Sequence, residues 1–120
     1  MPLHESAEMY LETIYTLSLQ NSTVRGIDIA TAMGYTKPSV SRAVSLLKRD
    51  GYVETDKDGF LNLTDTGRAI AEKIYERHHV LAAALMALGV NQDTAAEDAC
   101  RMEHVISDST FAAIKEHLKH

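Results

Sequence analysis

The sequence contains one cysteine, Cys100, and no tryptophan among its 120 residues. A single cysteine excludes an internal disulfide framework and is typical of a protein in a reducing compartment. No basic segment followed by an apolar stretch comes after Met1, so we expect no secretion signal and a cytoplasmic location. The longest uncharged apolar run, from Val80 to Val90, is too short to span a bilayer, which takes about 20 residues. We therefore expect no membrane partner.

Proline is also scarce, and no segment has the composition of a linker or a low-complexity tract. The net charge of −5 excludes a uniformly basic coat for nucleic acid, although it allows a local basic patch. Hydrophobic residues make up 45% of the chain and charged residues 24%, as in an ordinary globular protein. A monomer of this length has a modest core, so dimerisation would add stability.

Apolar spacing predicts a mainly helical first half with one hairpin. The expected elements are helices over residues 6–19, 26–33 and 36–50 and strands over residues 52–55 and 60–63. Asp58-Gly59 between the two strands is a hairpin signal. Thr36 is the expected N-cap of the third helix, and Pro38 falls in its first turn, where the missing N–H costs nothing.

The second half is predicted to be entirely helical. A long helix over about 65–87 ends at Gly89, a second helix capped by Asp93 or Thr94 extends to about Ile106, and a last helix follows Ser107-Asp108. Three helices followed by a hairpin form the winged helix-turn-helix pattern, and the later helices make a natural dimerisation unit. We therefore predict a winged helix-turn-helix domain over residues 1–70 and an all-helical domain over residues 71–120.

Basic charge is concentrated between residues 25 and 49, where the only acid is Asp28. Small hydroxyl side chains and two cations at the start of the third helix suit a recognition helix in a DNA major groove. Arg42 is placed to reach a guanine edge, and its neighbours are placed to hold phosphates. The predicted contacts with double-stranded DNA are Arg25, Thr36, Lys37, Pro38, Ser39, Ser41, Arg42 and, at the hairpin tip, Lys57. The alternative is a solvated basic face on a module that binds protein.

Cys100, Glu103 and His104 are spaced so that one helix face would present all three. A thiolate, a carboxylate and an imidazole that point the same way form half of a transition-metal site. Two other interpretations stay open at this point. One is a core cysteine beside a surface Glu–His pair. The other is a cysteine nucleophile with a histidine base, which has no visible orienting partner.

Four stretches follow one another over nearly the whole chain: residues 8–15 (EMYLETIY), 37–41 (KPSVS), 77–79 (RHH) and 98–108 (DACRMEHVISD). In content and order they resemble the diphtheria toxin repressor and manganese transport regulator family of metal-dependent transcriptional repressors. The resemblance implies that the domain over residues 71–120 both binds metal and dimerises.

The resemblance also implies a primary metal site in which Met9 of the first helix joins Cys100, Glu103 and His104. Methionine and cysteine at these positions match the iron-responsive branch, whereas the manganese branch has an acid at both. Soft sulfur ligands favour Fe²⁺ over Mn²⁺, and they also accept Zn²⁺, Co²⁺, Ni²⁺ or Cd²⁺ in vitro. We therefore expect Fe²⁺ more than Mn²⁺ as the metal.

A second metal site is implied by the same resemblance, with His78, or the histidine after it, as one ligand. The iron-responsive branch adds a glutamate and a second histidine, but this sequence has Ala82 and Ala96 there. The manganese branch instead uses a first-helix glutamate, which Glu12 matches, with carboxylates from the later helix. The choice lies between a hybrid site, made of Glu12, His78 and Glu103, and a surface histidine at position 78.

The implied function is a repressor that binds operator DNA as a metal-loaded homodimer and controls metal-uptake genes, without enzymatic activity. Many iron-responsive members carry a further SH3-like domain; this sequence ends at His120, so we expect the short form. The runner-up is a winged-helix regulator that senses a small organic ligand or, through Cys100, the redox state. A small metalloenzyme is a third class, but the ligands would fill most of the coordination sphere and no separate general base is evident.

Overall fold

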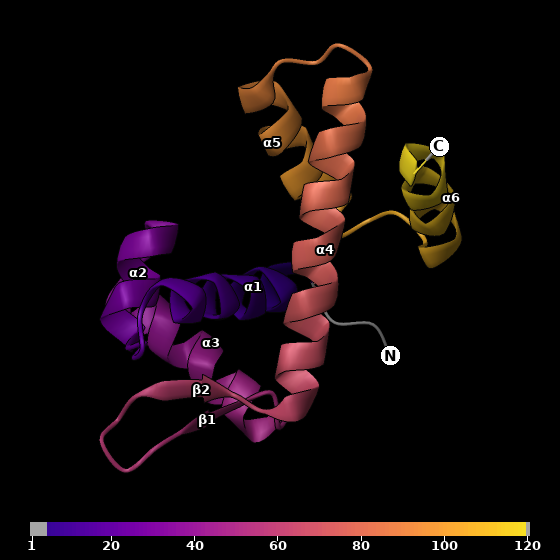
Figure 1. Cartoon of the computed structure of the whole chain (residues 1–120). Helices are drawn as coiled ribbons and strands as arrows, with labels where there is room; N and C mark the ends of the chain where they lie inside the picture. The colour runs from indigo at the N-terminus through magenta and orange to yellow at the C-terminus, as the bar shows by residue number, and fades with distance from the viewer. Residues whose placement is uncertain (1–4, 120) are drawn as a thin grey trace. The chain divides into compact units, whose positions relative to one another are not determined.

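The computed structural model describes residues 5–119, which form helices and one small antiparallel hairpin (Figure 1). The elements in chain order are α1 (Glu5–Gln20), α2 (Gly26–Met33), α3 (Lys37–Arg49), β1 (Val53–Thr55), β2 (Leu61–Leu63), α4 (Asp65–Ala87), α5 (Gln92–Met102) and α6 (Asp108–Lys119). The predicted fold class, mainly helical with a winged helix-turn-helix, is confirmed. Contacts divide the chain within α4, between Glu72 and Lys73, and each unit is described by itself.

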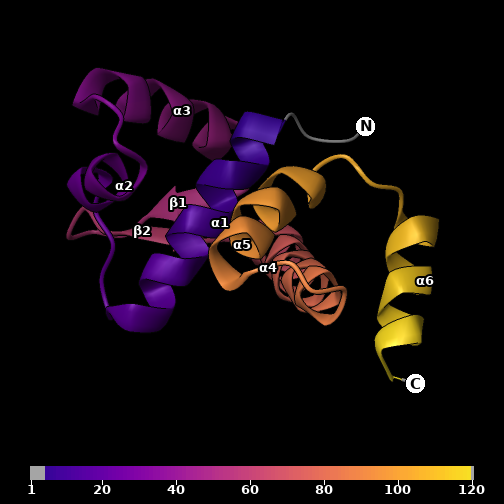
Figure 2. The same cartoon turned by 90° about the horizontal axis from the view of Figure 1, so that it is seen from above.

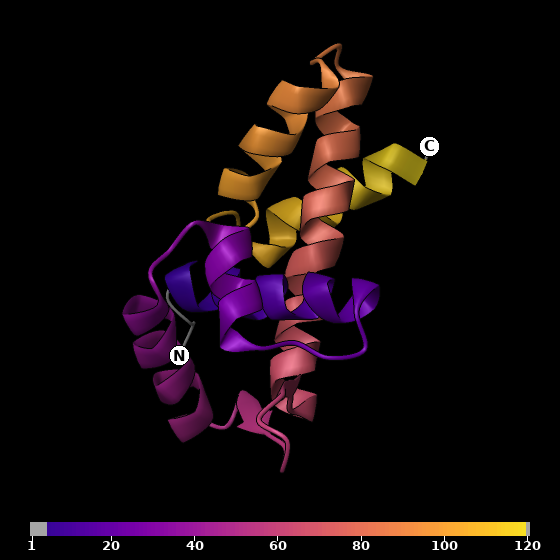
Figure 3. The ribbon, with the colours of Figure 1, turned by 90° about the vertical axis from the view of Figure 1, so that its left-hand side faces the viewer.

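The first unit has one hydrophobic core, to which all of its helices and both strands contribute. Figures 2 and 3 show α1, α2 and α3 beside one another, in agreement with the contacts among the three helices. Tyr10, Leu11 and Ile14 bury one side of α1, as in an amphipathic helix. The other buried members are Val24, Ile29, Ala30, Val40, Val44, Leu47, Val53, Leu61, Leu63 and Ala71.

The turn between α2 and α3 follows from two local signals. Gly34 adopts a left-handed conformation (φ 72°) at the C-terminus of α2, which glycine does without strain. Thr36 then caps α3, because its hydroxyl accepts a hydrogen bond from the Ser39 N–H at 3.3 Å. Pro38 lies in the first turn of α3. The predicted cap and first turn are thereby confirmed.

The hairpin, which we call the wing, pairs Val53 with Leu63 and Thr55 with Leu61. Each strand begins one residue later than predicted. Tyr52 stays outside β1 because its N–H donates to the Leu47 carbonyl at the end of α3, at 2.9 Å. Phe60 stays outside β2 because its N–H donates to the side chain of Asp56, at 3.1 Å.

The second unit contains the rest of α4 together with α5 and α6, and α5 runs alongside α4 (Figures 1 and 3). Gly89, at φ 102°, follows the end of α4 as predicted. The predicted cap of α5 was wrong: Asn91, and not Asp93 or Thr94, accepts the capping hydrogen bond, from the Thr94 N–H at 2.9 Å. In the described part of the chain, no helix is long and apolar enough to cross a membrane.

The predicted end of α5 at Ile106 was also wrong, because the helix ends at Met102. The carbonyls of Glu103 and Ile106 accept hydrogen bonds from the buried side chain of Arg77, at 3.2 and 2.8 Å. These carbonyls are satisfied from α4 and need no further helical turn. Ser107 then caps α6 by accepting from the Thr110 N–H at 3.1 Å.

Gly67, in the first turn of α4, packs closely against the backbone of Tyr52, the residue before β1. A Cβ atom at Gly67 would overlap with the carbonyl oxygen of Tyr52, which is itself held by the Thr64 N–H at 3.1 Å. We expect Gly67→Ala to lower the free energy of unfolding by roughly 1–3 kcal/mol, since the backbone must shift. Urea denaturation measures this loss. Gly26→Ala is the matched control, because a Cβ atom there meets nothing within 4 Å. Equal stability of the two variants would contradict this packing.

Candidate metal centre and nucleic-acid surface

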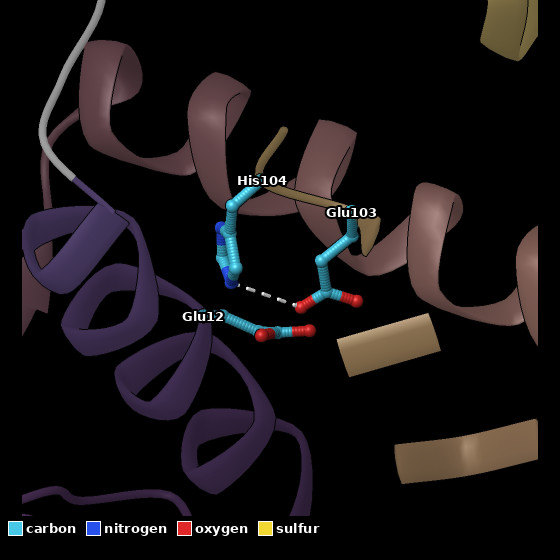
Figure 4. A group of neighbouring side chains, drawn as sticks. All are labelled: Glu12, Glu103 and His104. Carbon is cyan, nitrogen blue, oxygen red and sulfur yellow. Dashed lines mark ion pairs between the residues drawn. The ribbon is translucent and has the colours of Figure 1, made fainter. Parts of the chain in front are cut away.

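Glu103 is a fully buried acid whose carboxylate lies between two imidazoles of the second unit. Its Oε2 is 2.9 Å from Nδ1 of His78, and its Oε1 is 3.3 Å from Nε2 of His104. Figure 4 shows the pair of Glu103 and His104, with the two side chains turned toward one another. The exposed fraction of the side chain is 1% for His104 and 27% for His78. We call these three residues the His–Glu–His cluster.

The chemistry of this cluster fits a divalent transition metal. Imidazole nitrogen and carboxylate oxygen are ligands that suit iron and manganese, and imidazole suits zinc as well. A buried carboxylate is costly unless a positive charge or hydrogen-bond donors compensate for it. His78 hydrogen-bonds to the carboxylate, and Nε2 of His104 lies at ion-pair distance from it. The nitrogen lone pairs of the two imidazoles and the carboxylate oxygens together form a donor set for a cation. The donor types present therefore fit a metal site.

The spacing predicted one shared helix face for Cys100, Glu103 and His104, and this stays a prediction. Cys100 lies within α5 and is exposed, whereas Glu103 and His104 follow the end of that helix and have buried side chains. The three donors therefore differ in exposure and in secondary structure.

The two adjacent histidines of α4 have different environments. His78 faces Glu103, as described above. His79 is exposed, and its ring contacts the ring of Tyr75 edge to face, with the centroids 4.4 Å apart. The structure thus brings His78, and not its neighbour, to the buried carboxylate. Ala82, one turn further along α4, offers no ligand atom.

The remaining predicted metal ligands belong to α1, in the first unit. Met9 and Glu12 lie on this helix and are both half-buried, and Figure 4 includes Glu12 on the ribbon of α1. On α5, the half-buried Ala96 carries no donor at the position where the iron-responsive branch has a histidine. Their assignment to metal sites is taken up below as a proposal.

On the nucleic-acid side, α3 buries one face and exposes the rest. Val40, Val44 and Leu47 point into the core. On the opposite side, Thr36 donates to Ser39 Oγ at 2.9 Å, and Arg42 donates from Nη2 to the same oxygen at 3.4 Å. This chain of hydrogen bonds lays the guanidinium of Arg42 along the exposed surface of its own helix.

A groove of about 340 Å³ lies between α2, α3 and the wing. Its polar lining comes mainly from one stripe of α3, made of Lys37, Ser41, Ser45 and Lys48. Ser45 and Lys48 were not among the predicted DNA contacts. Their spacing from Lys37, eight and eleven residues, was the available signal, because it returns to the same side of a helix. The groove therefore extends the basic surface of α3 toward the wing.

The predicted contacts at the two ends of this surface are exposed. The guanidinium of Arg25, just before α2, stacks over the ring of Phe60 in the wing, with Cζ 4.6 Å from the centroid. The backbone N–H of Arg25 also donates to the carboxylate of Asp28 at 2.8 Å. Lys57 is exposed in the loop between β1 and β2, where the sequence placed the hairpin tip.

Comparison with known proteins agrees with both halves of this description. Residues 2–61 match the family described as iron dependent repressor, N-terminal DNA binding domain. Residues 64–120 match the family described as iron dependent repressor, metal binding and dimerisation domain. The chain therefore belongs to the iron-dependent repressor family of metal-dependent transcriptional repressors, and the predicted resemblance is confirmed. This is a family of regulators and not of enzymes.

The chain is similar to a diphtheria toxin repressor, to a relative named for iron and to a solved structure named for manganese. It is 35% identical to the diphtheria toxin repressor of Corynebacterium diphtheriae over 98% of this chain and 52% of the relative. It is 36% identical to the iron-dependent repressor IdeR of Mycobacterium bovis over 88% of this chain and 46% of the relative. The solved structure of the manganese regulator SloR superposes with a TM-score of 0.83 at 31% identity, covering 94% of this chain and 53% of that one. The chain thus spans about half the length of these relatives.

Proposed function

We propose that this chain is a metal-dependent transcriptional repressor that binds operator DNA as a homodimer when loaded with metal and controls metal-uptake genes. The observation that carries this proposal is the buried His–Glu–His cluster. It lies in the part of the chain that matches the family's metal binding and dimerisation domain. The first unit supports the DNA-binding role, since it presents the basic face of α3 beside the wing.

The primary metal site, in this proposal, uses Met9, Cys100, Glu103 and His104. A second site uses Glu12 and His78 together with Glu103. The burial and proximity of Glu103, His104 and His78 support their inclusion, whereas the other ligands are assigned by resemblance to the family. Sulfur from Met9 and Cys100 favours Fe²⁺ over Mn²⁺ as the physiological metal.

The proposed mechanism depends on where these ligands sit in the sequence. Met9 and Glu12 of α1, together with donors at residues 100–104, would hold the metal, which would supply a cross-link between these two parts of the chain. Met9 and Glu12 thereby restrict the orientation of the DNA-binding unit. In a dimer, two such units must meet half-sites about 34–36 Å apart, or a multiple of that distance. A metal at 100 times its Kd stabilises the competent state by at most about 2.7 kcal/mol per site, and two sites in a dimer would double this.

The proposal is tested by DNA binding measured as fluorescence anisotropy under anaerobic conditions. The probe is promoter DNA from upstream of a metal-uptake gene in the same genome, titrated with Fe²⁺, then Mn²⁺, with a chelator control. We expect tight binding at a lower concentration of Fe²⁺ than of Mn²⁺, reversed by the chelator. A Mn²⁺ response equal to or better than the Fe²⁺ response would overturn the iron preference. A DNA affinity that is unchanged by chelator but altered by oxidant would instead favour a redox regulator that uses Cys100.

The adjacent histidines of α4 provide a matched pair for the second site. His78→Ala removes the imidazole that faces Glu103, whereas His79→Ala removes an exposed ring that contacts Tyr75. We expect the first variant to weaken Mn²⁺ binding by roughly tenfold or more, since even side chains that only orient metal ligands contribute about 10–100-fold. The second variant also loses an edge contact with the His78 ring, at 5.4 Å between centroids, and should weaken binding far less than the first. Calorimetric titration with Mn²⁺ measures both, and equal affinities would exclude His78 as a ligand.

Substitutions of Arg42 and Lys48 distinguish two kinds of DNA contact by α3, with bases and with phosphates. We expect Arg42→Ala to relax specificity at one base position and to cost about 1–3 kcal/mol on the preferred operator. Lys48→Ala should weaken binding to all sequences alike and reduce the salt slope by about 1. Anisotropy titrations of operator and scrambled DNA at several salt concentrations distinguish the two effects. A uniform loss for Arg42→Ala would show that Arg42 contacts phosphate instead of a base.

A further inference from the structure

Arg77 is a buried cation of the second unit, beside His78 on α4. Its side chain is 7% exposed. One guanidinium nitrogen donates to the carbonyls of Glu103 and Ile106, at 3.2 and 2.8 Å, and the other donates to the carboxylate of Asp108. The two carbonyls belong to the connection between α5 and α6, and Asp108 is the first residue of α6. Arg77 therefore binds this connection at two points from α4 and the start of α6 at a third.

The guanidinium also reaches the first turn of α6. Its Cζ atom lies 5.3 Å from the centroid of the Phe111 ring, and Phe111 is the buried residue of that helix. A planar fork of N–H donors can serve two carbonyls and a carboxylate at once, whereas a lysine ammonium is a point charge on a flexible stem. The arrangement is thus specific to arginine.

The metal ligands of this region need such support. The Glu103 N–H still donates to the Ala99 carbonyl at 2.9 Å, but α5 ends at Met102, and the carbonyls of Glu103 and Ile106 take their donors from Arg77. Arg77 accounts for two carbonyls of residues 103–106, one of them that of Glu103 itself. A side chain whose backbone is already ordered loses less conformational entropy when a ligand binds.

We propose that Arg77 is a positioning residue of the metal centre. It holds residues 103–106 so that Glu103 and His104 stand ready for a metal, and it ties that turn to the start of α6. This inference rests on the proposed function, because it assumes that the His–Glu–His cluster binds a metal. It adds that the affinity of the cluster depends on a side chain that is not itself a ligand.

Replacement of Arg77 does not leave a buried charge without compensation, because its charged partner, Asp108, is exposed. The side chain of Asp108 is 76% exposed and also pairs with Lys73 Nζ at 2.9 Å. The hydrogen bond from Lys73 is the main cause that lowers the pKa of the Asp108 carboxyl below its usual value, and the nearby charges of Lys73 and Arg77 add to it. Removal of Arg77 therefore leaves Asp108 paired and solvated, so we expect Arg77→Met to fold.

The test is Mn²⁺ binding by calorimetric titration of the full chain, with Arg77→Met and Arg77→Lys compared with the wild type. We expect Arg77→Met to weaken Mn²⁺ binding by about 10–100-fold, the usual effect of residues that orient metal ligands. Arg77→Lys should fall between this variant and the wild type. Arg101→Met, which removes an exposed arginine of α5, is the matched control and should leave affinity unchanged.

A second measurement separates positioning from general stability. Amide hydrogen exchange of residues 103–106 in the metal-loaded protein should be faster in Arg77→Met than in Arg101→Met. Urea denaturation of both variants provides the control, and we expect it to give the same free energy of unfolding for the two. Wild-type Mn²⁺ affinity in Arg77→Met would overturn this inference and leave the proposed function intact. If that variant does not fold, wild-type affinity in Arg77→Lys would overturn it in the same way. A wild-type protein that binds no Mn²⁺ would overturn both the inference and the proposed function.

Discussion

The local structure of the second unit depends on the burial of one carboxylate. Glu103 is shielded from water, and a charge in such a place is costly unless it is compensated. Two imidazoles approach it from different parts of the chain, His78 from α4 and His104 from the residue that follows it. The same residues that surround the carboxylate carry the nitrogen and oxygen donors that a divalent cation binds. The same interaction thus explains both the local structure and the proposed capacity to bind metal.

Consecutive residues of α4 take different parts in this arrangement. Arg77 holds the backbone of the α5–α6 connection, His78 faces the carboxylate, and His79 contacts Tyr75 at the exposed surface. Successive side chains of a helix point about 100° apart, which separates these roles without any irregularity in α4. The connection between α5 and α6 is consequently ordered from α4, so that metal ligands and α6 share one support.

The first unit is built from more local interactions, and most of it was predictable. Thr36 caps α3, Gly34 ends α2, and apolar spacing selects the buried faces of α1 and α3. These interactions join residues that are close in the chain, so the sequence alone predicts them. The wing strands were predicted one residue too long, because the hydrogen bonds of Tyr52 and Phe60 compete with the strand ladder. The groove that Ser45 and Lys48 help to line forms only when α2 and the wing lie beside α3.

Periodicity, capping residues and motif order were sufficient for the helical class, the element order and the family to which the chain belongs. They also singled out Glu103, His104 and His78 as residues with metal-binding chemistry. They did not show that α5 ends at Met102 or which of two histidines faces the carboxylate. Those outcomes depend on two long-range hydrogen bonds. His78 bonds to Glu103, 25 positions later, and Arg77 bonds to the carbonyl of Glu103, 26 positions later. Interactions over such separations leave no periodic signal, because they form only when α4 and the α5–α6 connection have come together.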